Sequence, residues 1–441
     1  MPEISVHKSP IVREELARTV LPSGLEVCVL PKRGFGKKYG VLATRYGSID
    51  SKFQVGGSDE IIEVPDGIAH FLEHKLFEEE FGSIDDKFAE LGASSNAFTN
   101  FTMTGYLFSC TDNFEPALDT LVDFVFRPYF TEQNVEKEKG IIEQEIRMNE
   151  DNPDWQCFFD FLKAMYQRHP VRIEIAGTVE SINRIDVDTL CKCYRTFYHP
   201  SNMALFVVGD VEPENVVDQA DRRLAGRDFG PGGPITRIYP EEPPEIGRQR
   251  VGRQMPVSEH LVCFGYKDTD VGHEGRTLLR KIVTTEMLMD VLIGRGSDLY
   301  NKLYEEGVID TTFGWDYEAE SGFAHVAMSG KTKDPETLVQ RVQEGIQALL
   351  DKGVDNEAFE RSQRRAMGAF IRGFNSLEFI AYNFLTYHFR GMNLLERVEV
   401  ASEVDADELS KAAEMLFRPE RRVVSVVSPG KDVELARGGD R

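Results

Sequence analysis

The chain has 441 residues, of which 41% are hydrophobic and 28% charged, and it contains 29 Phe and 14 Tyr. This composition supplies large apolar cores and excludes disorder along the whole length, and the length predicts two to four domains of roughly 100–200 residues. The 74 acidic and 51 basic residues give a net charge of −23. Such a chain repels phosphate backbones, so nucleic acid is excluded as an expected partner.

Six cysteines, at positions 28, 110, 157, 191, 193 and 263, are few for this length and typical of reduced thiols. Cys191-Lys192-Cys193 has no second Cys or His pair at zinc-finger spacing, so we interpret it as structural. The sequence MPEISVHKSPIVREEL lacks the apolar stretch of a signal peptide, and no run of 18 apolar residues occurs. We therefore expect a soluble, cytoplasmic protein that does not enter a membrane.

The first part of the chain mixes strand and helix patterns. Strands are predicted on both sides of a Pro-Ser-Gly turn within 18–32, and at 40–48 and 95–110, where β-branched and aromatic residues are frequent. Apolar residues at three- and four-residue steps predict a helix over 66–80 with Asp66 as its N-cap. Further helices are predicted at 83–91, 113–126, 131–150, 157–168 and 186–197, and a buried strand at 203–211.

A segment dense in Pro and Gly, 229–247, is predicted as a linker between two domains, 1–228 and 248–441. The second domain is predicted to contain strands at 260–268, 311–317, 322–330 and 421–429 and helices at 274–293, 297–306, 335–352, 355–373 and 376–389. Both halves mix strands with long helices in a similar order, which indicates an ancient duplication. The predicted fold class is α+β.

The sequence from Gly67 to His74, GIAHFLEH, is the most informative for chemistry. Residues four apart project from one face of a helix, so His70 and His74 can share a Zn²⁺ ion. Glu73 lies on the same side and can take a proton from a water on the metal. This is the H-x-x-E-H pattern, the inversion of the commoner H-E-x-x-H order. An unligated His pair on a stripe of large apolar residues would be costly, which favours a metal site.

A catalytic zinc ion takes three protein ligands and keeps one position open. The predicted helix 131–150 offers many carboxylates, and two of them, Glu138 and Glu145, are seven residues apart and share a face. One of the two can complete the metal site, and the other can accept a hydrogen bond from a histidine ring N–H. The residue types alone leave open which glutamate does which.

GIAHFLEH, followed later in the chain by EKEKGIIEQEI, resembles the pitrilysin and insulinase-type (inverzincin) zinc metallopeptidase family. The segments at 94–106, 169–182 and 197–211 are also similar to it, so the resemblance covers essentially the whole chain. It is closest to the bacterial two-half-length members, which are related to mitochondrial processing peptidase. The resemblance implies that zinc is bound by His70, His74 and Glu145, that Glu73 is the general base, that Glu138 hydrogen-bonds a ligand, and that Asn96 and Ala97 hold the substrate backbone.

In this family two α+β halves, each a mostly antiparallel sheet backed by helices, face each other across a closed chamber. A chain of this length supplies two of the four domains, so the resemblance implies a dimer closed like a clamshell. Active members complete the site with an Arg and a Tyr from a C-terminal half. Here Asp298 stands where the Arg is expected, and Ile309 or Asp310 near the expected Tyr.

This departure implies a heterodimer with a similar-length family subunit that supplies the Arg/Tyr pair. A homodimer that uses Arg295 with Tyr300 or Tyr304 in a shifted geometry is the alternative. The predicted function is that of a zinc-dependent endopeptidase that hydrolyses short unfolded peptides through a zinc-bound water activated by Glu73.

A catalytically incomplete family member, which binds zinc but acts as a subunit or scaffold of a processing complex, is the alternative function. The intact H-x-x-E-H sequence argues against this reading, and the missing Arg/Tyr pair argues for it. A different zinc hydrolase or a zinc-storage protein would leave the strand that carries Asn96 unexplained.

Overall fold

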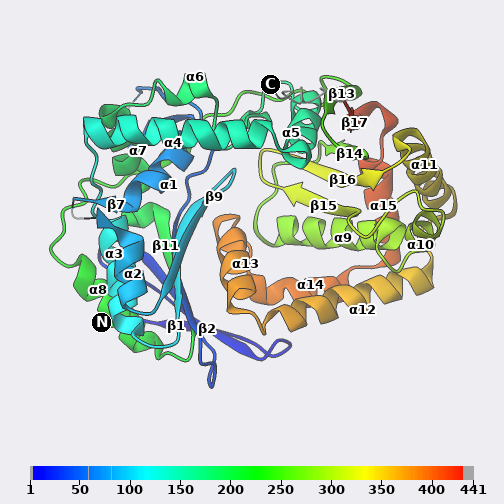
Figure 1. Cartoon of the computed structure of the whole chain (residues 1–441). Coiled ribbons are helices and arrows are strands. Elements are labelled where there is room, and N and C mark those ends of the chain that lie inside the picture. Colours follow the sequence, from blue (N-terminus) through cyan, green and yellow to red (C-terminus); the bar gives the residue numbers. More distant parts are fainter. Residues whose placement is uncertain (1–2, 58, 81, 431–441) are drawn as a thin grey trace, which may run out of the picture. The chain divides into compact units, whose positions relative to one another are not determined.

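The computed structural model describes residues 3–57, 59–80 and 82–430, which form two compact units (Figure 1). The first unit comprises Ile173–Pro240, Met367–Glu399 and the described residues up to Ile146. The second comprises Arg147–Arg172, Glu241–Ala366 and the described residues from Val400. Each unit has its own sheet with helices packed on it, so the predicted α+β class is confirmed. Within the described ranges, no helix is both long and apolar enough to cross a membrane.

The first unit is built on a seven-stranded sheet with the order β1-β2-β3-β11-β4-β10-β9. β3 and β11 are parallel, and the other neighbouring strands are antiparallel. β9 stands last in this order and therefore forms one edge of the sheet. The seven strands are β1 (Ser5–Ser9), β2 (Glu14–Val20), β3 (Glu26–Pro31), β4 (Lys38–Thr44), β9 (Ser94–Thr99), β10 (Thr104–Cys110) and β11 (Met203–Gly209).

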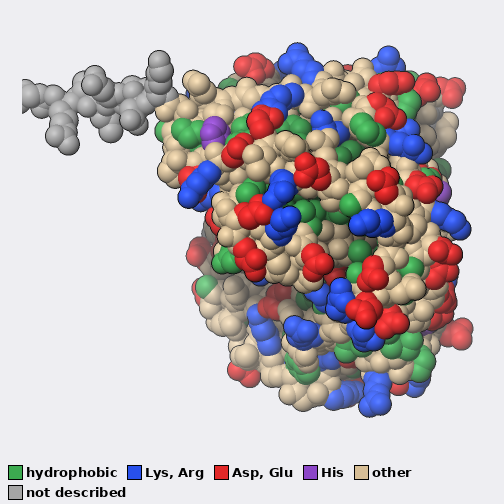
Figure 2. All heavy atoms as spheres, turned by 90° about the vertical axis from the view of Figure 1, so that its right-hand side faces the viewer, with side chains coloured by type: hydrophobic (Ala, Val, Ile, Leu, Met, Phe, Trp, Pro, Cys, Tyr) green, Lys and Arg blue, Asp and Glu red, His purple; other side chains and the backbone are tan. Residues whose placement is uncertain are grey.

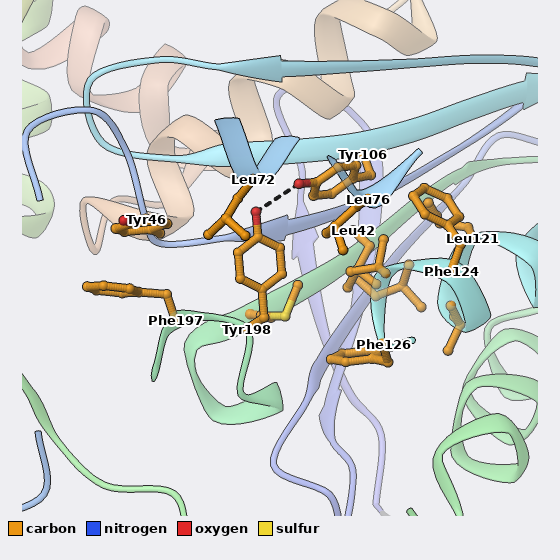
Figure 3. Packing of buried hydrophobic residues seen from close by; sticks show 14 of the residues in the cluster. Leu42, Tyr46, Leu72, Leu76, Tyr106, Leu121, Phe124, Phe126, Phe197 and Tyr198 are labelled. Atoms are coloured by element: carbon orange, nitrogen blue, oxygen red, sulfur yellow. Dashed lines mark hydrogen bonds between the residues drawn. The ribbon is translucent and has the colours of Figure 1, made fainter. Parts of the chain in front are cut away.

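Helices cover both faces of this sheet. On one face, Leu72 and Leu76 lie beside Tyr106 in a single hydrophobic cluster (Figure 3). On the other face, the ring of Phe384 stacks on Phe206 with 4.2 Å between centroids. Each fully buried side chain of this size contributes about 1.5–3 kcal/mol. The helices are α1 (Ile68–Leu76), α2 (Ile84–Glu90), α3 (Phe114–Val125), α4 (Glu132–Glu150), α6 (Val179–Ile182), α7 (Val187–Phe197), α8 (Pro213–Leu224) and α13 (Leu377–Phe389).

The second unit contains a five-stranded sheet with the order β13-β17-β14-β16-β15. Its strands are β13 (Arg250–Met255), β14 (His260–Asp268), β15 (Gly314–Ala319), β16 (Ala324–Thr332) and β17 (Arg422–Pro429). Its helices include α5 (Pro153–Met165), α9 (Gly275–Ile293), α10 (Asp298–Glu305), α11 (Pro335–Lys352) and α15 (Ala406–Leu416). Among the described residues, three helices contain a boundary between the units: α4, whose residues 147–150 belong to the second unit, α12 (Asn356–Gly373) and α14 (Arg397–Glu403).

The two sheets share one topology. Five strands of the first sheet, β3, β4, β9, β10 and β11, can be compared with the five strands of the second. In each set the strands that come first and last in the chain, β3 with β11 and β13 with β17, are parallel neighbours in the sheet. Every other pairing is antiparallel. The order β3-β11-β4-β10-β9 in the first unit therefore corresponds strand for strand to β13-β17-β14-β16-β15 in the second. This agreement supports the duplication indicated by the sequence.

The segment 229–247, predicted as a linker, contains a short strand. β12 (Ile235–Arg237) pairs with β5 (Lys52–Val55), which also pairs with β6 (Ile62–Glu63). Arg237 and Tyr239 both contact the buried carboxylate of Asp50, at 3.2 Å and 2.6 Å. The chain passes from the first unit to the second within this segment, after Pro240.

The negative charge is spread rather than gathered on the face shown in Figure 2. Acidic and basic side chains are interspersed over that face. The second unit contains ion pairs between such side chains, for example Arg341 with Glu306 and Arg280 with Glu408. Exposed pairs of this kind each contribute about 0–1 kcal/mol. The net charge of −23 therefore does not produce a single acidic patch on this side.

Candidate metal centre

The position of α1 is set by the residue that precedes it. Gly67 is the N-cap of the helix, with φ of 89°, a backbone conformation that side chains with a Cβ rarely adopt. A Cβ at this position would lie 2.3 Å from the carbonyl oxygen of Ala176. The prediction of Asp66 as N-cap is therefore wrong. Gly67 caps α1 without a side-chain bond, and the Asp66 carbonyl instead accepts a hydrogen bond from Ser181 at 2.8 Å.

His70, His74 and Glu145 converge between α1 and α4. Nε2 of His70 lies 3.4 Å from Oε1 of Glu145, and Nε2 of His74 lies 3.5 Å from Oε2. In the described part of the chain, these three residues form the one group of His, Cys, Asp and Glu whose ligand atoms all lie within 4.8 Å of one another. Cys191 and Cys193 are not part of it.

This donor set fits zinc. A tetrahedral ion with ligand bonds of about 2.0–2.1 Å separates neighbouring donor atoms by roughly 3.3–3.4 Å, close to the spacings observed here. The His70 side chain is 11% exposed, whereas those of His74 and Glu145 are 26% and 30% exposed. The group is therefore partly exposed to solvent, through His74 and Glu145 more than through His70.

The three groups also polarise one another. Burial alone would lower the pKa of His74, but hydrogen bonds with Glu138 and Glu145 raise it to about 10. Hydrogen bonds from His70 and His74 hold the pKa of the Glu145 carboxyl well below its usual range. A metal ion at His74 Nε2 must therefore displace a proton from the imidazole, which couples metal affinity to pH.

Glu138 lies behind His74. Its Oε1 is 3.0 Å from His74 Nδ1, and only 8% of its side chain is exposed. Burial raises the pKa of Glu138, but His74 and Lys75 outweigh it and leave the pKa below the usual range. The sequence spacing left two roles open for Glu138 and Glu145. The structure places Glu145 against both Nε2 atoms and Glu138 against Nδ1 of His74.

Glu73 is held by a residue that the sequence analysis did not identify. Oγ1 of Thr99 donates a hydrogen bond to Glu73 Oε2 at 2.6 Å. A second threonine, Thr104, lies 3.2 Å from Thr99 Oγ1 and donates its own proton to the Tyr46 carbonyl. The sequence of β9 indicates that Thr99 lies on the same face of the strand as Ala97, because alternate residues of a strand share a face. The contact of Thr99 with Glu73 could not be predicted in this way, since it depends on the packing of α1 against β9.

Asn96 and Ala97 lie in the middle of β9, whose only strand neighbour in the described structure is β10. The backbone N–H of Ala97 donates to Oδ1 of Asn96 at 2.9 Å, and Asn96 is exposed. The two residues predicted to hold a substrate backbone thus stand on an open sheet edge, next to the strand residue that contacts Glu73.

Asp298, which stands at the expected Arg position, and the alternative residues Arg295, Tyr300 and Tyr304 all lie in the second unit. Asp298 is the first residue of α10, where a negative charge is favourable beside the positive end of the helix dipole. Nη2 of Arg295 donates to the carbonyl of Thr311 at 3.2 Å. Tyr300 is buried, whereas Tyr304 is 48% exposed, and their rings are stacked. Asp298 therefore has a local role at the start of a helix.

Two family models match the chain. The model described as Insulinase (Peptidase family M16) matches residues 55–179, which include α1, β9 and α4. The model described as Peptidase M16 inactive domain matches residues 184–366. The first match contains all the residues of the metal centre, and the second contains most of the second sheet.

Whole-length relatives agree with the family models. The Bacillus subtilis (strain 168) protein described as uncharacterized zinc protease YmfH is 43% identical over 95% of this chain and 99% of its own. A crystal structure of an M16-like peptidase from Alicyclobacillus acidocaldarius matches 95% of this chain and 99% of its own with a TM-score of 0.92 and 37% identity. A protease structure from Helicobacter pylori covers 97% of this chain and 100% of its own at a TM-score of 0.82 and shares the fold at 19% identity. These findings confirm the predicted enzyme class, a zinc protease with two M16 domains. The chain therefore belongs to the insulinase family of peptidases, family M16.

Proposed function

We propose that this chain is a zinc-dependent endopeptidase that hydrolyses short unfolded peptides, with His70, His74 and Glu145 as zinc ligands and Glu73 as the general base. The observation that carries the proposal is the convergence of two imidazole nitrogens on one carboxylate at 3.4 and 3.5 Å, beside a glutamate on the same helix. Family membership supports a peptide as substrate.

The chain's own residues supply the proton chemistry. Zinc, when bound, would provide a Lewis acid that lowers the pKa of a water and stabilises negative charge on the peptide oxygen. Oε2 of Glu73 already accepts from Thr99, so Oε1 is the oxygen that takes the proton from the attacking water. The same carboxyl can then return the proton to the leaving amine. Glu138 keeps the His74 ring in place throughout.

The open edge of β9 suits an extended peptide. A substrate strand added to this edge would receive main-chain hydrogen bonds, including one from the Ala97 N–H that Asn96 now occupies. An unfolded segment presents free backbone groups along its whole length for such pairing, whereas most backbone groups of a folded protein are already paired. The edge strand thus supports selection of short unfolded peptides over folded proteins.

We also propose that the active form is a clamshell dimer, most simply a heterodimer with a similar-length family subunit that supplies an Arg and a Tyr. Asp298 at the predicted Arg position supports this, because a carboxylate would repel the oxyanion that an Arg stabilises. The alternatives are a homodimer using Arg295, and a chain that binds zinc but serves mainly as a subunit or scaffold of a processing complex.

Metal analysis and peptide hydrolysis test the ligand and base assignments together. Wild-type protein should carry about one zinc per chain, and His74→Ala should carry none. Glu73→Gln should retain zinc while hydrolysis falls by roughly 10²–10⁴-fold, since the amide cannot accept the proton. Equal zinc in wild type and His74→Ala would overturn the site, and near-normal turnover in Glu73→Gln would remove Glu73 from the mechanism.

A matched pair of variants distinguishes the roles of Glu138 and Glu145, the two glutamates of α4. Glu145→Gln should abolish zinc binding, whereas Glu138→Gln should weaken it by roughly 10–100-fold. The reverse order of effects would exchange the two roles.

A further inference from the structure

Lys75, which follows His74 on α1, is completely buried, with 0% of its surface exposed. An ammonium group in this position needs acidic partners, because an unpaired buried charge is very costly. Its Nζ donates to Oε2 of Glu78 and lies 3.5 Å from Oε2 of Glu138. Glu78 keeps 32% of its side chain exposed, whereas Glu138 keeps 8%. Of the two partners, Glu138 is thus the one that depends more on a neighbouring cation.

The two oxygens of Glu138 are divided between two partners. Oε1 faces Nδ1 of His74 at 3.0 Å, and Oε2 faces Lys75. His74 in turn directs Nε2 toward Glu145. Lys75, Glu138, His74 and Glu145 therefore form one continuous line of polar contacts that ends at the metal-ligating atoms.

The importance of Lys75 increases when a metal is present. A histidine that ligates through Nε2 is neutral and keeps its proton on Nδ1, which here would be donated to Glu138. Lys75 is then the full positive charge in contact with this nearly buried carboxylate. Without it, Glu138 would carry an uncompensated charge beside a neutral ring, and rotation toward solvent would release His74.

We propose that Lys75 is a positioning residue of the metal centre, which holds the Glu138 carboxylate in the orientation that aligns His74 and thereby sets the affinity for zinc. This inference rests on the proposed zinc site and adds Lys75 to Glu138 as a second residue behind the ligands. The alternative is a purely structural role, in which the ion pair of Lys75 with Glu78 links the end of α1 to β7 (Glu78–Glu79). In that case the loss of Lys75 would not change zinc affinity through Glu138.

The test is a double-mutant cycle on the full-length chain. Lys75→Met keeps the length and removes the charge, and it is compared with Glu138→Gln and with the double variant. The zinc dissociation constant is measured by competition with a chelator of known affinity, and thermal unfolding is followed in excess EDTA. Lys75→Met should weaken zinc binding by about 10-fold or more, and the double variant should bind no more weakly than Glu138→Gln alone.

Lys137→Met is the matched control, since this lysine also lies near Glu78, at 3.9 Å, but is 66% exposed and has no contact with Glu138 among the described ion pairs. Its zinc affinity should stay within about threefold of wild type. If Lys75→Met shows no cooperative unfolding, Lys75→Gln takes its place in the cycle.

The outcomes separate the two proposals. Tight zinc binding by wild type together with unchanged affinity in Lys75→Met, or with effects that add to those of Glu138→Gln, overturns the role of Lys75 alone. Failure of the wild-type chain to bind zinc overturns the zinc site itself.

Discussion

The carboxylate of Glu73 depends on one hydroxyl for its orientation. Thr99 donates to Oε2 from the edge strand β9, while Thr104 has already committed its proton to a backbone carbonyl. A hydrogen bond to a charged group contributes about 1.5–3 kcal/mol. That energy also selects one rotamer of Glu73, the one that leaves Oε1 available for proton transfer.

Replacement of Thr99 by Val, which has nearly the same shape, should therefore lower kcat by roughly 10–100-fold with zinc content unchanged. Thr99→Ser restores the hydroxyl and should recover most of the rate. Steady-state kinetics that resolve kcat from KM check this. Equal rates in the Val and Ser variants would show that the hydroxyl is not needed.

Among single residues, the sequence predicted correctly those positions that the spacing within one helix determines. His70, Glu73 and His74 lie within five residues, so a helix alone brings them to one face. The roles of Glu138 and Glu145 are distinguished by their distances to the histidines of another helix. The contacts of Thr99 with Glu73 and of Lys75 with Glu138 likewise join separate elements. Such contacts depend on tertiary packing, which periodicity within one segment does not contain.

At the scale of elements, α1 owes its place to Gly67. Gly67→Ala should destabilise the first unit by about 1–3 kcal/mol for the positive φ alone, with a further cost from the approach to the Ala176 carbonyl. Because α1 carries both histidines, zinc binding should weaken as well. Thermal unfolding and zinc titration measure the two effects.

Gly140 provides the control for this substitution. It lies on α4, two residues after Glu138, and a Cβ there would meet nothing within 4 Å. Gly140→Ala should leave zinc binding unchanged and stabilise the protein by about 0.5–1 kcal/mol. A similar loss of stability in both variants would refute the specific requirement at Gly67.

Helices with a clear cap and strands with a buried apolar run were predicted closely. The strand 260–268 and the helix 335–352 coincide with β14 and α11, and the helix predicted at 83–91 corresponds to α2, with Ser83 as its N-cap. β13 was missed because its sequence, RVGRQM, is polar and alternates in burial, so it is held by its pairing with β17 more than by apolar content. α8 and α15 were also not predicted, although Pro213 and Asp405 stand at their starts.

At the scale of a whole unit, buried histidine makes stability depend on pH. Burial lowers the pKa of His325 to about 4, although Glu318 opposes the shift. Above pH about 6.5 the ring is neutral in both folded and unfolded chains, and below it the unfolded chain gains a proton that the folded chain refuses. The contribution of this site to stability is therefore lost between about pH 6.5 and 4, by about 3 kcal/mol in total.

His325→Phe should flatten this part of the stability profile, because phenylalanine fits among Phe158, Phe161 and Phe323 and does not titrate. Denaturant unfolding at pH 7 and pH 4.5 provides the measurement, with the exposed His7→Gln as control. A profile as steep as that of wild type would mean that other groups govern the acid loss.

For the whole molecule, the proposed partner makes a further prediction. The isolated chain should bind zinc but hydrolyse peptides poorly, because Asp298 offers no positive charge for the oxyanion. Addition of a similar-length family subunit carrying Arg and Tyr should raise activity by about 10²-fold or more. Full activity of the isolated chain, lost in Arg295→Ala, would instead support the homodimer.

Synthesis from the N-terminus gives the strand order of the first unit a consequence for folding in the cell. β11 occupies the middle of its sheet but is made after the other six strands, and α13, which stacks Phe384 on Phe206, emerges only after β16. A nascent chain therefore exposes the apolar face of β4 and β11 on which α13 later packs, until α13 has left the ribosome. The unit that begins first is completed late, so a ribosome that stalls before residue 377 holds a sheet in need of a chaperone.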